Sequence, residues 1–94
     1  MSIESFRHNG LRRLIEDDDA RGVPGAHANK IRRLLFALQE AIEVSEMARY
    51  PGWRLHPLKG DLDGPWSATG TGNWRIVFRF DNGGAFDVDL IDYH

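Results

Sequence analysis

Proton-handling side chains stand at the end of this sequence. Residues 92–94 combine a carboxylate, a phenol and an imidazole, and they follow a strand-like segment at 86–91. Two other polar sets lie upstream: a histidine and a lysine within 56–59, and an asparagine and an arginine within 73–75. These residue types can move protons and stabilise negative charge that develops on a phosphate. The sequence therefore holds the groups needed to cleave RNA, if the fold brings them together.

RNA cleavage needs a base for the ribose 2′-hydroxyl, an acid for the leaving oxygen and cations for the phosphate. His56 or His94 could transfer protons, because imidazole titrates near neutral pH. Asp92 could act as the base or orient an imidazole. Lys59 and Arg75 could stabilise charge, since a guanidinium offers two parallel donors to a phosphate.

Each of these side chains also has a structural interpretation. Tyr93 could stack on a base or simply pack. His56 and Lys59 could be surface loop residues, and Asn73 could be an ordinary turn residue. Taken singly, the structural interpretation is the commoner one. The catalytic interpretation depends on the ends of several strands meeting at one place.

The composition indicates one folded domain. Of the 94 residues, 41% are hydrophobic and 28% are charged, as in ordinary globular proteins. The absence of cysteine excludes disulfides and thiol catalysis. No segment has the apolar length of a signal peptide or a membrane span, so we expect a cytoplasmic protein. The four histidines lack the spacing of zinc ligands, and the aspartates at 17–19 lack that of a calcium loop.

Charge is unevenly distributed along the chain. The net charge is −2, whereas nucleic-acid binders usually carry a basic face. Residues 1–60 hold 10 basic and 8 acidic side chains, and residues 61–94 hold 2 and 6. A local basic patch is still possible in the first third, which holds Arg12, Arg13, Arg21, Lys30, Arg32 and Arg33. The candidates for RNA binding among them are Arg12, Arg13, Arg32 and Arg33. The alternative is a solvated helix surface.

The first half of the sequence predicts a short strand at 2–6 and two helices. Asn9 is a suitable cap for a helix at 10–17 that buries Leu11, Leu14 and Ile15. The segment 17–25 has no apolar period, and we expect an irregular, mobile connection. A second helix is predicted over 24–43. Its apolar stripe consists of Ala28, Ile31, Leu34, Leu35, Leu38 and Ile42.

The second half predicts strands. The segments 53–57 and 66–69 suit short strands, with turns at 61–64 and 70–72. Apolar side chains alternate with others from Trp74 to Phe80, as in a half-buried strand. Asp81-Asn-Gly-Gly84 then predicts a tight hairpin.

Matching the apolar faces of this hairpin predicts its register. Phe80 would face Phe86, Phe78 would face Val88, and Ile76 would face Leu90. On the other face, Arg79 would lie opposite Asp87, a pair that contributes ~0.2–1 kcal/mol. Arg75 would lie opposite Ile91, with Asp89 on the diagonal. We therefore expect Arg75, rather than Arg79, to serve a ligand.

The order of these elements predicts an α+β fold, β-α-α-β-β-β, in a single domain over residues 1–94. Two helices would pack on one face of a largely antiparallel sheet. We expect the polar residues of the site on the other face.

The combined motifs resemble the HigB-type toxins of the RelE/ParE superfamily, also called plasmid-maintenance killer proteins. The matching segments are HPLKGDL at 56–62, GNWRIVFRF at 72–80 and DVDLIDYH at 87–94. The opening residues 3–11 and the helix start at 22–24 also fit. The resemblance covers essentially the whole chain, and the pattern is specific as a combination.

The resemblance implies a RelE-like, ribonuclease-type fold and cleavage of messenger RNA on the translating ribosome, without a metal or other cofactor. It assigns catalytic roles to the side chains of the three motifs, and RNA binding to Asn73. The catalytic set is His56, Lys59, Arg75, Asp92, Tyr93 and His94. It also implies a helix-turn-helix antitoxin, whose dimer would hold two toxins in a heterotetramer and contact operator DNA.

Three functions are compatible with this resemblance, and the first two compete directly. The first is a ribosome-dependent endoribonuclease. The second is a non-enzymatic toxin that binds a protein target such as gyrase, as ParE-type members do, and a third is an inactive partner-binding module. The terminal Asp-Tyr-His, together with His-x-x-Lys, favours the enzyme, because a pure binder does not need proton-transfer groups.

Overall fold

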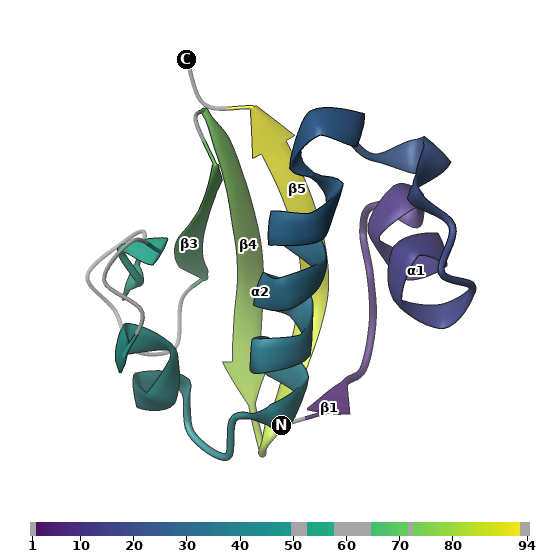
Figure 1. The fold of residues 1–94 in the computed structure, drawn as a ribbon. Helices are drawn as coiled ribbons and strands as arrows, with labels where there is room; N and C mark the ends of the chain where they lie inside the picture. The colour runs from purple at the N-terminus through teal and green to yellow at the C-terminus, as the bar shows by residue number, and fades with distance from the viewer. Residues whose placement is uncertain (1, 50–52, 58–64, 72, 93–94) are drawn as a thin grey trace.

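The computed structural model describes residues 2–49, 53–57, 65–71 and 73–92 (Figure 1). Five strands in this part of the chain form one sheet, in the order β1-β5-β4-β3-β2. β1 pairs in parallel with β5, and the other neighbours are antiparallel. The strands are β1 Ser2–Ile3, β2 His56–Pro57, β3 Trp66–Thr71, β4 Trp74–Asp81 and β5 Gly84–Asp92. The predicted α+β class is confirmed. The strand expected at 53–57 is present only as the two residues of β2, and with it four strands follow the helices, one more than in the order β-α-α-β-β-β.

Helix α2, Ala28–Glu40, lies across one face of the sheet and supplies much of the core (Figure 1). Its stripe from Ile31 to Leu38 is fully buried, together with Ile76 and Phe78 of β4 and Val88 of β5. The stripe was predicted correctly except at Ile42, which is 77% exposed. Ile42 lies outside the helix because the backbone becomes extended at Ala41.

Helix α1, Asn9–Glu16, packs beside β5 and α2. The predicted Asn9 cap is wrong by one residue. His8 caps the helix, because its Nδ1 accepts a hydrogen bond from the Leu11 N–H at 3.2 Å. An imidazole nitrogen can satisfy an unpaired N–H of the first turn as a carboxamide would.

The segment expected to be an irregular connection contains two short 3-10 helices, η1 at Ala20–Gly22 and η2 at Gly25–His27. Asp19 caps η1 and forms a forked ion pair with Arg21, whose Nε and Nη2 both lie 2.9 Å from its carboxylate oxygens. The side-chain hydrogen bonds from Arg21, followed by the backbone one, hold the pKa of Asp19 well below its usual range. Local capping therefore orders a segment that has no apolar period.

A close backbone contact joins this segment to α1. A Cβ added to Gly22 would lie 2.6 Å from the Cα of Gly10, and a Cβ added to Gly10 would lie 2.2 Å from the carbonyl oxygen of Gly22. Neither position therefore has room for a side chain. Val23 follows at once and is buried in the core.

β3 begins at Trp66 as predicted but ends later than expected. Gly70 and Thr71 belong to β3, so the turn expected at 70–72 comes later, with Asn73 in it. The turn expected at 61–64 lies outside the described residues. Within the described residues, no helix is long and apolar enough to cross a membrane.

The β4–β5 hairpin has the predicted two-residue turn. Asp81 pairs with Gly84, and Asn82 and Gly83 both have positive φ, 48° and 79°. At the other end of the hairpin, the predicted pairs are also confirmed: Arg75 lies opposite Ile91, and Ile76 lies opposite Leu90.

A bulge between these ends changes the remaining register. Phe80 faces Ala85 instead of Phe86, and Arg79 faces Phe86 instead of Asp87. Asp87 has a φ of +54° at the bulge. Its N–H donates to Ser5 Oγ at 2.8 Å, so the N-terminal segment holds the extra residue in place.

Candidate functional site

Three predicted site residues meet at one end of the sheet, where β3 turns into β4 and β5 ends (Figure 1). Asn73 is exposed in the turn, and Arg75 is the second residue of β4. Trp74 pairs with Asp92, so the end of β5 lies beside the start of β4. The fold therefore brings together two motifs that are 17 residues apart in the sequence, at Arg75 and Asp92.

Arg75 lies on the sheet face opposite α2. Its neighbour Ile76 is buried beneath the helices, and side chains alternate between the two faces along a strand. The Arg75 side chain is partly buried, and its Nη1 donates to the carbonyl oxygen of Trp74 at 3.3 Å. This hydrogen bond holds the guanidinium near the strand end.

Strand pairing connects the backbone of His56 to this part of the sheet. His56 pairs with Ser67, which pairs with Val77, and Val77 is two residues from Arg75 on β4. With neighbouring strands about 4.8 Å apart, His56 and Val77 are separated by about 10 Å across β3. The sheet thus brings the backbone of His56 within two strands of the Asn-x-Arg motif.

Asp92 has a different orientation from the one that its sequence motif suggests. Side chains alternate between the two faces along β5, so position 92 belongs to the same face as Leu90, which is buried on the helix side. Arg75 lies on the opposite, open face. Asp92 is nevertheless exposed, because it is at the strand end. It therefore borders the open face without belonging to it. The other predicted catalytic residues, Lys59, Tyr93 and His94, lie outside the described residues.

The four arginines predicted to bind RNA do not form one patch with Arg75. Arg12 and Arg13 are exposed on α1, and Arg12 pairs with Glu16 at 3.6 Å. The Arg13 guanidinium lies close to Gly22. The helix α1 lies beside β5, so these cations are separate from the β4 end of the sheet (Figure 1).

On α2, the two remaining arginines differ from each other. Arg32 links α2 to the aspartates at 17–19, because its Nη2 lies 2.9 Å from Asp18. Its Nη1 also donates to Asn29 of the same helix at 2.9 Å. Arg33 is exposed and lines a groove beside Trp53. Arg32 therefore has a structural role that the sequence pattern did not indicate.

Sequence reasoning missed one cleft on the open face. It has a volume of about 320 Å³ and is lined by side chains of β4 and β5 together with Arg7 and Pro65. Arg79 and Asp87 form an ion pair in it, with Nε to Oδ2 at 3.5 Å. The ion pair was predicted, although the bulge brings it about rather than direct pairing. Among the described residues, no group of three or more His, Asp or Glu side chains could hold a metal ion.

Comparison with known proteins agrees with this fold and these motifs. Residues 4–94 match the family model described as the RelE-like toxin of the type II toxin-antitoxin system HigB. The endoribonuclease HigB of Proteus vulgaris is 45% identical over 92 residues, which cover 98% of this chain and 99% of that protein. The match includes the chain segments that contain all three motifs. On these grounds the chain belongs to the HigB family of RelE-like toxins from type II toxin-antitoxin systems.

Proposed function

We propose that this toxin is an endoribonuclease that cleaves messenger RNA on the translating ribosome and so arrests growth in the cytoplasm. The observation that carries the proposal is the 45% identity, over nearly the full length of both chains, to a protein named endoribonuclease HigB. The presence of His-x-x-Lys, Asn-x-Arg and Asp-Tyr-His in one sequence supports it.

The proposed chemistry uses the open face of the sheet. Arg75 stabilises negative charge on the scissile phosphate, with Lys59 as the second cation. His56, Asp92 and His94 form the proton-transfer set, in which one group removes the proton of the 2′-hydroxyl and another protonates the leaving 5′-oxygen. Tyr93 and Asn73 position the nucleotide. The pairing of β2, β3 and β4, which brings the backbone of His56 close to the strand that carries Arg75, supports this arrangement.

Ribosome dependence is proposed from the charge of the chain. A net charge of −2 and arginines that are spread over α1 and α2 offer little independent attraction to a polyanion. The ribosome would instead hold the messenger RNA in position for the toxin. Family membership implies an antitoxin partner, and we propose a helix-turn-helix dimer that binds two toxins and contacts operator DNA.

The test is to map messenger RNA ends after brief expression of the toxin without its antitoxin. We expect cuts within translated regions, and cleavage by purified toxin on programmed ribosomes. Rapid cleavage of naked RNA by catalytic amounts of toxin would contradict ribosome dependence. DNA breaks with intact messages would contradict the endoribonuclease and favour a gyrase-binding toxin.

A further inference from the structure

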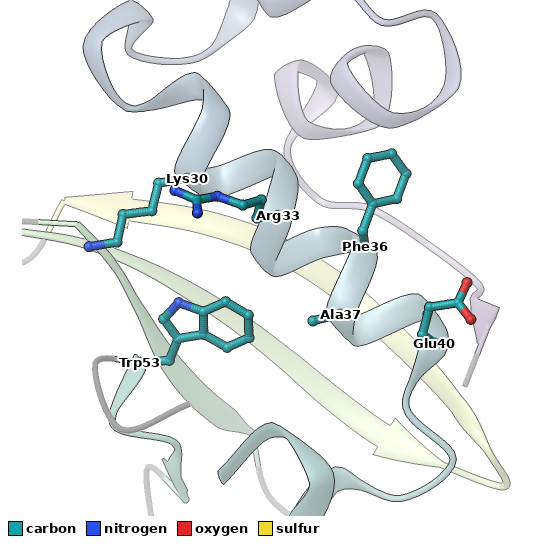
Figure 2. Close-up of a pocket in the computed structure, with 6 residues that line it drawn as sticks. All are labelled: Lys30, Arg33, Phe36, Ala37, Glu40 and Trp53. Atoms are coloured by element: carbon teal, nitrogen blue, oxygen red, sulfur yellow. The ribbon is translucent and has the colours of Figure 1, made fainter. Parts of the chain in front are cut away.

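A groove of about 500 Å³ lies between α2 and the segment that carries Trp53 (Figure 2). It is on the helix-bearing side of the sheet, whereas Arg75 lies on the opposite face. The residues that line it are Lys30, Arg33, Phe36, Ala37, Glu40 and Trp53. The groove is therefore distinct from the proposed catalytic surface.

The middle of this groove is apolar. Ala37 has a small side chain, and the indole of Trp53 faces α2 beneath it (Figure 2). Trp53 packs against the core while remaining partly exposed. The ring of Phe36 next to Ala37 is 49% exposed, which is unusual for so large an apolar side chain. Covering these surfaces would remove apolar area from water and so favour binding.

The two ends of the groove carry opposite charges. Lys30 and Arg33 lie together near the N-terminal end of α2, and Glu40 is the last residue of the helix (Figure 2). A helix rises about 1.5 Å per residue, so Lys30 and Glu40 are about 15 Å apart. A complementary segment would have acidic side chains at one end, apolar side chains in the middle and a polar or basic side chain facing Glu40.

We propose that this groove binds an amphipathic segment of the antitoxin, whose apolar side chains pack on Trp53 and Ala37 and whose acidic side chains face Lys30 and Arg33. The inference rests on the proposed toxin function, which supplies the antitoxin as the partner. Amphipathic helices bind in apolar grooves of this kind. An RNA strand fits less well, because RNA-binding grooves carry cations along their length, and this one ends at Glu40.

Two arginine substitutions on α2 test the proposal as a matched pair. Ala37→Arg fills the middle of the groove, whereas Gln39→Arg adds the same charge at an exposed position of the same helix that does not line the groove. Arginine is a good helix former at both positions. We expect Ala37→Arg to weaken the affinity for the purified cognate antitoxin by about tenfold or more, and Gln39→Arg to leave it within about twofold.

Charge reversal gives a second variant that does not disturb packing. Lys30 is exposed, so Lys30→Glu should fold normally. It therefore tests the groove even if Ala37→Arg fails to fold. We expect it to weaken antitoxin binding by roughly fivefold at low salt, with the difference shrinking as salt screens the charges. We also expect antitoxin binding to change the indole emission of the wild type, and Trp53→Phe to remove most of that change.

Wild-type affinity of both Ala37→Arg and Lys30→Glu for the antitoxin would overturn the proposal. A parallel titration with a single-stranded RNA oligonucleotide gives the competing outcome. If the groove variants lose RNA binding and keep antitoxin binding, the groove is an RNA contact and the proposal is wrong. The binding assay needs no cleavage, so it remains valid if the toxin is found not to be a ribonuclease.

Discussion

Arg75 and Arg79 lie on the same face of β4, and their surroundings differ. Arg79 is about half exposed and forms an ion pair with Asp87 at 3.5 Å, halfway along the hairpin. Arg75 is partly buried at the strand end, beside the turn that carries Asn73. We therefore propose that Arg75 contacts the RNA phosphate and that Arg79 stabilises the hairpin.

Replacing each arginine by alanine should separate these roles. Arg75→Ala is expected to keep the fold and to slow cleavage by about 100-fold or more, because it removes a donor to developing charge. Arg79→Ala should cleave at close to the wild-type rate and cost about 0–1 kcal/mol of stability, since an exposed ion pair contributes little. Single-turnover cleavage on programmed ribosomes and melting temperatures provide the measurements. Equal cleavage rates for the two variants would show that the assignment is wrong.

His94 is the second residue at which chemistry can be separated from stability. His94→Ala is expected to slow cleavage by about 10²–10⁴-fold, the usual contribution of a positioned acid or base. The melting temperature provides the control, because a catalytic role predicts no change in it. If His94→Ala cleaves as fast as the wild type, the proton-transfer role belongs to another group, with His56 the next to be tested.

At the scale of elements, the contact between Gly10 and Gly22 fixes how α1 meets η1. Gly22→Ala should destabilise the protein by about 1–3 kcal/mol, because the new Cβ would lie 2.6 Å from a backbone atom that cannot move freely. Gly25→Ala is the matched control. Nothing lies within 4 Å of its Cβ position, so its effect should remain within about 1 kcal/mol and could be stabilising. Equal unfolding free energies for both variants in urea would contradict this reading of the contact.

The cap of η1 makes stability depend on acid pH. Hydrogen bonds from Arg21 lower the pKa of Asp19 in the folded protein, so the carboxylate stabilises the fold above its unfolded pKa of about 4. This stabilisation is lost as the pH falls from there toward the folded pKa. Asp19→Asn should therefore lower the melting temperature slightly at pH 7 and by less in acid. A difference that is constant between pH 7 and pH 3 would count against the ion pair, whose solvent exposure keeps the effect small.

Periodicity and turn chemistry were sufficient to predict α2, the two-residue turn at 82–83 and the pairs at both Arg75 and Ile76. They were not sufficient for features that depend on distant contacts. The bulge at Asp87 is held by Ser5, which is 82 residues away in the sequence. The His8 cap was missed because histidine is an uncommon cap.

The candidate site likewise has features that the sequence predicted and features that it did not. The resemblance selected Arg75 and His56, and the strand pairing places their backbones two strands apart in one sheet. It did not indicate that Asp92 occupies a strand position of the helix-bearing face, opposite to the face of Arg75. Nor did the sequence pattern separate Arg32, which is used by Asp18 and Asn29, from Arg33, which lines a groove. Charge alone cannot distinguish a structural arginine from one that binds a ligand.

At the scale of the whole molecule, the helices cover one face of the sheet and leave Arg75 on the other. The proposed antitoxin groove and the proposed catalytic surface are thus on different sides of one domain. Variants of the two sides should therefore act independently. Combining Ala37→Arg with Arg75→Ala should give a toxin whose losses of antitoxin affinity and of cleavage rate each equal those of the single variants. Non-additive losses would show that the two surfaces are coupled.

β5 lies between β1 and β4, although it is made after every other element described here. A growing chain that still holds residues 84–92 inside the exit tunnel has no strand to join its first residues to the β3–β4 pair. It also lacks Ala85, Val88 and Leu90 of the core. Sheet closure, which requires contacts between the two ends of the sequence, must wait until this strand emerges. A chain truncated before Gly84 lacks the strand that joins β1 to β4, so we expect it not to fold into this sheet.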